Sequence, residues 1–446
     1  MKISRVLQYV FLGCGLLSLA SYGAQTRTLP NGLKIVVEED HRAPIAVVMV
    51  WYHVGSADEP GGLTGISHML EHYMFQGTPQ HPAGEFSRII SAKGGQENAF
   101  TSYDYTAFFE KIAQQSLSEV LALEADRMQH LIWNPTSFAK ELKVVREERR
   151  LRTDDNPQDT AFERFMATAH LTPPYQHPVI GWMEDLDNLH LQDAHNWYQH
   201  YYAPNNATLV VVGDVSAPAV FKIASRHFGA LHSQSDFSRR RQPEPVPLGP
   251  KSVIIQIPAK MPAIILGYPV PSRVTSDSAW EPYALELLAG IFDAGESGRL
   301  SQHLIKNKAI ASNVNTDYNM YSRYPTLFTF TATPSKEKTL AVLKQNILQE
   351  IEKIQKKPVS VTELDRVKHQ IIAQKTFEKD SIFYRAMEIG ILETIGLGYQ
   401  VQDQYIANIN AITPAQIQSV AQKYLHPNVL TEAQLLPQTT LAQESS

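Results

Sequence analysis

The second half of the chain repeats the order of segments in the first half, and this duplication is the strongest constraint on its fold. The segment "PAIILGYPVPS" resembles "PIAVVMVWYHVGS", and a helical segment follows each of them. At the far end of each half, "KYLHPNVLTEAQLLP" resembles "YYAPNNATLVVVGDV". Aligning Pro204 with Pro427 gives two units of about 200 residues each, an internal duplication rather than a solenoid. We therefore expect two similar domains.

Segments typical of strands alternate irregularly with segments typical of helices. The stretch "APIAVVMVWYHVGS" reads as a buried strand, and a long helical stretch covers residues 116–152 with an interruption near Asn134 and Pro135. Irregular alternation favours an α+β arrangement over a doubly wound sheet.

A Pro-rich stretch with Ser, Arg and Gln, residues 233–250, predicts a linker between the two units. The first unit then covers residues 24–232 and the second covers residues 251–434. The polar end of the chain, residues 435–446, predicts a flexible tail.

The first 23 residues have the layout of a secretory signal peptide. Lys2 and Arg5 precede an apolar stretch that ends at Leu19, and small residues follow it. Cleavage after Gly23 fits the small-residue rule best, which predicts a periplasmic or secreted protein without a stable membrane span. Lipidation at Cys14 is the weaker alternative, because Phe11, Leu12 and Gly13 match the usual small residues before such a cysteine poorly and the apolar stretch continues past it.

Composition excludes some partners and some kinds of metal site. The chain of 446 residues is 43% hydrophobic with a net charge of −5, so it offers no basic surface for nucleic acid. Cys14 is the only cysteine and lies in the expected signal peptide. A metal site in the mature chain must therefore use His, Asp and Glu, which suits zinc in a hydrolytic site.

The stretch "GISHMLEHYMFQGT" places two histidines and a glutamate within five positions. On a helix, His68, Glu71 and His72 share one face, while the opposite face is apolar. Two imidazoles four residues apart can reach a single ion, and Glu71 beside them can take a proton from a water molecule. A solvated helix face is the alternative, and the pattern needs a third ligand.

The stretch "FAKELKVVREERRLRTDDNP" supplies candidates for that ligand. Glu141 and Glu148 are seven residues apart and point to the same side of a helix, which Val144 and Val145 also occupy. Carboxylates flanked by valines suggest a face turned inward, where a cation would offset the cost of burial. A solvated helix rich in Glu and Arg is again the alternative.

Together these segments resemble the pitrilysin-type (M16) zinc metallopeptidases, the family of insulin-degrading enzyme and of the mitochondrial processing peptidase, in its bacterial M16B-like form. The segment "GSADEPGGLTGISHMLEHYMFQGT" is similar to the family signature almost throughout, and the pair Glu141 and Glu148 has the family's spacing. The resemblance implies two similar domains, each an antiparallel sheet packed with helices, of the kind found in LuxS and processing-peptidase-like metallohydrolases.

The resemblance also implies the roles of individual residues. His68, His72 and Glu148 would bind one zinc ion per chain, Glu71 would activate water, and Glu141 would support the site. The segment at Asn98 and Ala99 would be the edge strand to which a peptide substrate adds by main-chain hydrogen bonds. The second unit has apolar or small residues at the metal-capable positions of "LELLAGIFDAG", so it would carry no metal.

One family feature is missing from the second half. Family members commonly carry an Arg and a Tyr seven residues apart that contact the substrate, and here Ile305 and Ser312 occupy those positions. Arg299 and Tyr318 lie nearby but do not match the spacing. We hypothesise that a second, related subunit supplies the pair in a heterodimer; a homodimer is the other assembly that we expect.

The leading interpretation is an exported zinc endopeptidase that acts on unstructured peptides. A non-catalytic or partner-dependent subunit of an M16 heterodimer is the alternative, as is a metal-storage or metal-sensing protein. Intact motif residues in the first half favour the peptidase.

Overall fold

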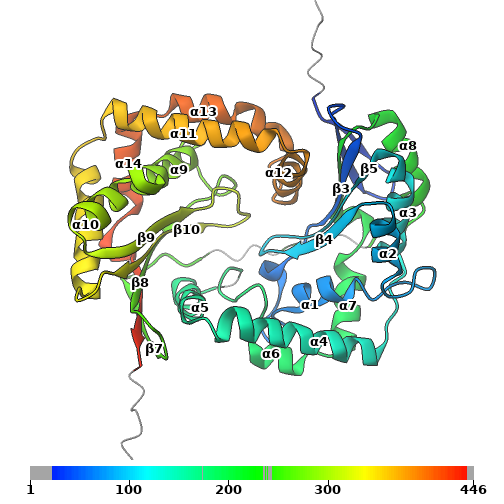
Figure 1. Ribbon diagram of the computed structural model, residues 1–446, viewed down its shortest axis with the longest axis horizontal. Helices are drawn as coiled ribbons and strands as arrows, with labels where there is room; N and C mark the ends of the chain where they lie inside the picture. Colours follow the sequence, from blue (N-terminus) through cyan, green and yellow to red (C-terminus); the bar gives the residue numbers. More distant parts are fainter. Residues whose placement is uncertain (1–22, 173, 235–236, 238, 240–243, 439–446) are drawn as a thin grey trace, which may run out of the picture.

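The structure is a computed structural model that describes residues 23–438 apart from 173, 235–236, 238 and 240–243 (Figure 1). Each half of the chain forms one sheet with helices packed against it, as the duplication predicted. Residues 1–22 of the expected signal peptide, parts of the expected linker and residues 439–446 of the expected tail lie outside the described residues.

The first half contributes six strands and eight α-helices among the described residues. The strands are β1 Gln25–Thr28, β2 Lys34–Glu39, β3 Ile45–Tyr52, β4 Gln96–Thr101, β5 Thr106–Ala113 and β6 Ala207–Gly213. The helices are α1 Ile66–Tyr73, α2 Glu85–Ala92, α3 Leu117–Gln129, α4 Pro135–Arg149, α5 Pro157–Ala169, α6 Met183–Asn188, α7 Leu191–Tyr201 and α8 Ala217–Phe228.

The second half contributes five strands and six α-helices within the same described range. The strands are β7 Lys251–Ile257, β8 Ala263–Val270, β9 Ala311–Tyr318, β10 Thr326–Pro334 and β11 Thr431–Pro437. The helices are α9 Glu281–Phe292, α10 Leu340–Lys356, α11 Val361–Lys379, α12 Ile382–Thr394, α13 Tyr405–Ala411 and α14 Pro414–Tyr424.

The two sheets share one strand order. The order in the first sheet is β1-β2-β6-β3-β5-β4. The order in the second sheet, β7-β11-β8-β10-β9, repeats it but has no strand equivalent to β1 among the described residues. Neighbouring strands are antiparallel except for β2 with β6 and β7 with β11, which are parallel. Each sheet is therefore antiparallel apart from one parallel pair. That pair joins an early strand of its half to the last strand of the same half, and a long stretch of chain connects the two strands.

One helix of each half packs against the sheet of the other half. Helix α5 of the first half packs on β7 and β11, and helix α12 of the second half packs on β3 and β6 (Figure 1). Val47, Met49 and Trp51 of β3 form a buried cluster with Ala386 and Ile389 of α12. Helices thus cover both faces of β3, which explains its almost continuous apolar sequence.

Two local features differ from the sequence expectations or add to them. Strand β11 runs to Pro437 with Leu435 buried, so residues 435–437 belong to the second sheet rather than to the tail. After α4, the backbone continues as a π-helical segment over Arg150–Asp154. In the described part of the chain, no helix combines the length and apolar character needed to cross a membrane.

Candidate active site

The start of helix α1 is fixed by a buried carboxylate and a close backbone contact. Glu59 accepts hydrogen bonds from the backbone N–H of Gly65 at 2.7 Å and of Ser67 at 2.8 Å, so it satisfies two donors at the helix start. Gly65 has a φ of 86°, and a Cβ there would overlap the carbonyl oxygen of Ile180. These contacts set where the next turn of α1 points.

Helix α1 has the two faces that its sequence predicted. Ile66, Met69, Leu70 and Tyr73 are fully buried in the core of the first half. The imidazole rings of His68 and His72 stand one turn apart on the other face, with centroids separated by 4.9 Å.

Helix α4 brings the two carboxylates to this face. Asn134 caps the helix by accepting hydrogen bonds from the backbone of Thr136 and Ser137, and Pro135 starts it. Val145 is buried, but Val144 is 44% exposed, so the expectation that both valines face inward was wrong for Val144. The two positions lie about 100° apart around the helix, which is enough to place one of them in solvent.

Glu148 and the two histidines converge on one point. The Glu148 Oε2 atom lies 3.8 Å from His68 Nε2 and 3.2 Å from His72 Nε2. One ligand-capable atom from each of the three residues lies within 4.8 Å of the others. Ligands ~2.0–2.1 Å from a tetrahedral zinc ion are roughly 3.3 Å apart, so the donor set fits such an ion. Neighbouring Glu147 is exposed and pairs with Arg150.

Glu71 stands beside this cluster. Its side chain is mostly buried, and its Oε2 atom accepts a hydrogen bond from the hydroxyl of Thr101 on β4. Burial raises the pKa of the Glu71 carboxyl, and the Thr101 hydroxyl and the nearby His72 partly offset that rise.

Glu141 lies behind His72. Its Oε1 atom accepts a hydrogen bond of 2.9 Å from Gln76, and its Oε2 atom is 3.9 Å from His72 Nδ1. The carboxylate is therefore on the side of the imidazole that faces away from Glu148.

Burial and neighbouring charges set the protonation of the cluster. Burial, with a smaller effect of His72, lowers the pKa of His68 to about 4, which keeps its imidazole neutral. The hydrogen bond from His72 lowers the pKa of Glu148. Burial lowers the pKa of His72, but its contacts with Glu148 outweigh this and leave the pKa raised. Neutral imidazole and ionised carboxylate are the forms that bind metal ions.

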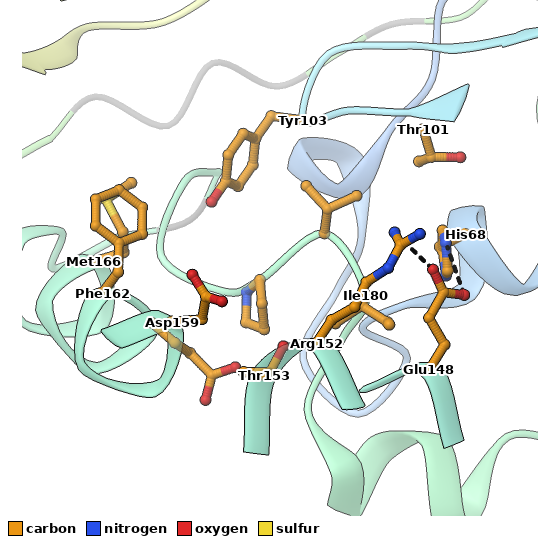
Figure 2. Close-up of a pocket in the computed structure, with 13 residues that line it drawn as sticks. His68, Thr101, Tyr103, Glu148, Arg152, Thr153, Asp159, Phe162, Met166 and Ile180 are labelled. Carbon is orange, nitrogen blue, oxygen red and sulfur yellow. Dashed lines mark ion pairs between the residues drawn. The ribbon is translucent and has the colours of Figure 1, made fainter. Parts of the chain in front are cut away.

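Two hollows meet at the cluster. A groove of about 860 Å³ has Asn98 and Ala99 of edge strand β4 on one wall and α4 on the other. A second hollow of about 400 Å³ extends from His68 and Glu148 towards Tyr103 and Phe162 (Figure 2). The structure thus brings the predicted metal-binding, catalytic and peptide-binding residues to one place.

The sequence analysis did not predict three contacts of the carboxylates in the site. Thr101 contacts Glu71, Gln76 contacts Glu141, and Arg152 contacts Glu148. Arg152 Nη1 lies 2.7 Å from Glu148 Oε1. Arg152 follows Glu148 by four residues, which places both on one helical face, so the sequence could have suggested this ion pair. Thr101 lies on another element, so no local spacing connects it with Glu71.

The second half has Ile305 and Ser312 at the two positions where the resemblance implies an arginine and a tyrosine. Ile305 packs against the second core, and the Ser312 hydroxyl donates to carbonyl oxygens of β10. Nearby Arg299 forms two hydrogen bonds with Glu363, and the Tyr318 hydroxyl donates to the carbonyl of Pro271.

Comparison with known protein families gives matches to both halves. Residues 34–181 match the model described as "Insulinase (Peptidase family M16)". Residues 188–371 match the model described as "Peptidase M16 inactive domain".

Individual relatives agree with these matches. The zinc protease PqqE of Helicobacter pylori is 35% identical over 348 residues, which are 76% of this chain and 77% of that protein. A crystal structure of a protease from Helicobacter pylori is similar with a TM-score of 0.88 at 30% identity, over 93% of this chain and 99% of that one. The first half of the periplasmic protease PqqL from Escherichia coli shares the fold, with a TM-score of 0.76 at 19% identity over 93% of this chain and 92% of that one. The chain therefore belongs to peptidase family M16.

Proposed function

We propose that this protein is an exported, zinc-dependent endopeptidase that hydrolyses unstructured peptides. The observation that carries the proposal is the convergence of His68, His72 and Glu148 on one point, with Glu71 beside them in a groove. The relatives named zinc proteases support the same reaction and the same metal.

In this proposal His68, His72 and Glu148 hold one zinc ion per chain. Bound zinc supplies Lewis acidity, which lowers the pKa of a water molecule towards ~7 and polarises the scissile carbonyl. Glu71 takes the proton of the attacking water and passes it to the leaving amine. Thr101 holds the Glu71 carboxylate towards the groove, and Glu141 supports His72 from behind.

The peptide would lie along β4 as an added strand. Within the described sheet, β4 pairs only with β5, so its outer edge is available at Asn98 and Ala99. Main-chain pairing reads the backbone more than the side chains, so the specificity should be broad and the substrate unfolded.

The direct test is Glu71→Gln. Loss of the general base should lower kcat by ~10²–10⁴-fold while one zinc ion per chain remains bound. Glu148→Gln should instead lose zinc. Metal analysis by mass spectrometry and a quenched-fluorescence peptide assay measure both quantities. Full peptidase activity in Glu71→Gln would contradict the proposed role.

A partner-dependent subunit is the second candidate function. Ile305 and Ser312 provide no guanidinium and no phenol, and the second half matches the model of an inactive domain. In that case the isolated chain cleaves peptides poorly and gains activity when a related M16 subunit is added. Full activity of the isolated chain would refute this alternative.

The proposed export rests on the first 23 residues. The PqqL structure supports a periplasmic location, because that fold relative is named a periplasmic protease. Cleavage after Gly23 would leave Ala24 at the new terminus, where the Tyr399 hydroxyl donates a hydrogen bond of 2.6 Å to the Ala24 carbonyl. N-terminal sequencing of the mature protein should begin at Ala24, whereas a chain that begins at a lipidated Cys14 would overturn this site.

A further inference from the structure

Arg152 stands where the groove and the second hollow meet. It lines both hollows together with His68, Thr101 and Glu148, and Figure 2 shows these four residues in the second hollow. Its side chain is 76% exposed, although its Nη1 atom is 2.7 Å from Glu148 Oε1. A large, exposed cation at the candidate metal cluster is a feature that the proposed reaction does not yet use.

The other arginines of this segment contact other residues. Arg146 pairs with Asp187 and donates to the Leu186 carbonyl. Buried Arg149 donates to Glu163 and to the Gly181 carbonyl. Arg150 pairs with Glu147. None of these three arginines lines the groove or the second hollow, whereas Arg152 lines both.

Arg152 keeps most of its donors free. Among the described residues, its only ion-pair or hydrogen-bond contact is with Glu148 Oε1, while Glu148 Oε2 faces the imidazoles. A guanidinium has five N–H donors in a planar fork, so this contact leaves several of them for a ligand. Arg152 lies in the π-helical segment after α4, and such segments are frequent at functional sites.

A peptide bound to β4 would need donors on its far side. Its inner edge pairs with β4, while its outer edge faces the wall formed by α4 and the π-helical segment. Carbonyl groups on that outer edge lose water when the peptide enters the groove, and they cost free energy unless a donor replaces it. On this wall the cations are Lys143 and Arg152, and only Arg152 contacts Glu148.

We propose that Arg152 binds a main-chain carbonyl oxygen of the substrate beside the scissile bond, on the peptide edge that β4 leaves unpaired. The inference rests on the proposed function. It gives this chain its own guanidinium at the reacting bond, where Ile305 and Ser312 provide none.

The experiment compares Arg152→Gln, Arg152→Lys and the matched control Arg150→Gln in the Glu71→Gln background. Fluorescence anisotropy of an unstructured, labelled peptide gives its Kd in the zinc-loaded protein, and chelator competition gives the zinc affinity. Loss of a charged hydrogen bond should weaken peptide binding ~10- to 100-fold in Arg152→Gln. Arg152→Lys should recover part of the loss, because it keeps the charge without the fork. Arg150→Gln should bind like the parent.

Zinc affinity separates this role from mere support of Glu148. A residue that only orients a ligand costs ~10- to 100-fold in metal affinity when it is removed. The inference is overturned if Arg152→Gln loses zinc affinity by that factor and binds the peptide normally once saturated with zinc. If Arg152→Gln binds the peptide as tightly as the parent does and the wild type cleaves peptides, the inference about Arg152 is overturned while the proposed function stands. No peptide binding by the parent and no cleavage by the wild type would overturn the proposed function as well.

Discussion

Thr101 connects β4, along which we expect the substrate to bind, with Glu71, the expected general base. Its hydroxyl donates to Glu71, so Thr101→Val removes a donor from a mostly buried carboxylate without changing the side-chain shape. We expect kcat to fall about 10-fold, because the carboxylate loses ~1–2 kcal/mol of hydrogen bonding and its fixed orientation. Steady-state kinetics of Thr101→Val and Thr101→Ser measure this. Thr101→Ser keeps the hydroxyl and should stay near wild type, and equal losses in both variants would contradict the hydrogen-bond account.

Glu286 on α9 makes the stability depend on pH. Its Oε2 atom is shielded from solvent, and burial raises its pKa to about 7 against the effects of the Tyr405 hydroxyl and Lys375. The ordinary pKa of a glutamate, which applies to the unfolded chain, is 4.5. The folded protein therefore binds more protons between pH 4.5 and 7, so the free energy of unfolding falls as the pH rises through this window.

Glu286→Gln should remove the contribution of Glu286 to this dependence, whereas Glu59, whose pKa burial also raises to about 7, keeps its own. At pH 8 the variant should be more stable than wild type, by at most about 3 kcal/mol, and the difference should shrink or reverse at pH 4.5. Urea denaturation at both pH values measures the two free energies. A variant that is less stable than wild type at pH 8 would show that the Glu286 carboxylate is well satisfied when ionised.

Residue positions were predictable where helical periodicity governs them. The spacing of His68, Glu71 and His72 determined their common face, and the same spacing placed Glu148 with Glu141. The contact between Thr101 and Glu71 joins a strand to a helix, so it depends on how β4 packs against α1. No local pattern encodes that packing.

At the scale of elements, the exchanged helices meet the sheets in a reciprocal way. Phe165 is the ninth of the thirteen residues of α5, and Gly390 is the ninth of the thirteen residues of α12. At one crossing, Phe165 of the helix lies against Gly267 of β8. At the other, Gly390 of the helix receives Trp51 of β3. Each crossing pairs one large residue with one glycine, which lets helix and sheet approach closely.

Gly390→Ala should therefore displace α12 from the first sheet. A Cβ at this position would overlap the indole ring of Trp51, which is fully buried. We expect a loss of about 1–3 kcal/mol in the free energy of unfolding, since overpacking a core costs this amount. Chemical denaturation followed by Trp fluorescence measures it. Gly249→Ala is the control, because a Cβ there has no neighbour within 4 Å, and equal stability of the two variants would contradict the tight crossing.

The strands were predictable as elements, but their partners were not. The apolar run in "APIAVVMVWYHVGS" indicated β3, and burial on both faces explains why this run does not alternate with polar residues. An amphipathic helix such as α12 shows that it needs an apolar surface without showing which sheet provides it. The exchange of α5 and α12 therefore could not be read from two similar sequence units.

At the scale of the whole molecule, a polar contact adds to the exchanged helices. Arg323, from the loop between β9 and β10, donates to both carboxylate oxygens of Asp58 at 3.2 and 3.1 Å. Its backbone N–H donates to Asp104, which follows β4 and also binds the Tyr175 hydroxyl. The second half thus holds the loop before α1 and the end of the expected substrate strand, so the site depends on both halves.

Neither half should fold stably alone. Without α12, Val47, Met49 and Trp51 of β3 would lose the helix that buries them, and α5 would lose the second sheet. Exposing a buried apolar face of this kind promotes aggregation. Residues 24–250 and 251–446, expressed separately, should be insoluble, whereas co-expression should give a soluble 1:1 complex that binds zinc. Size-exclusion chromatography with light scattering and metal analysis measures this. A soluble first half that unfolds cooperatively by itself would mean that α12 adds little to its stability, and the two domains would then be independent in space as well as in sequence.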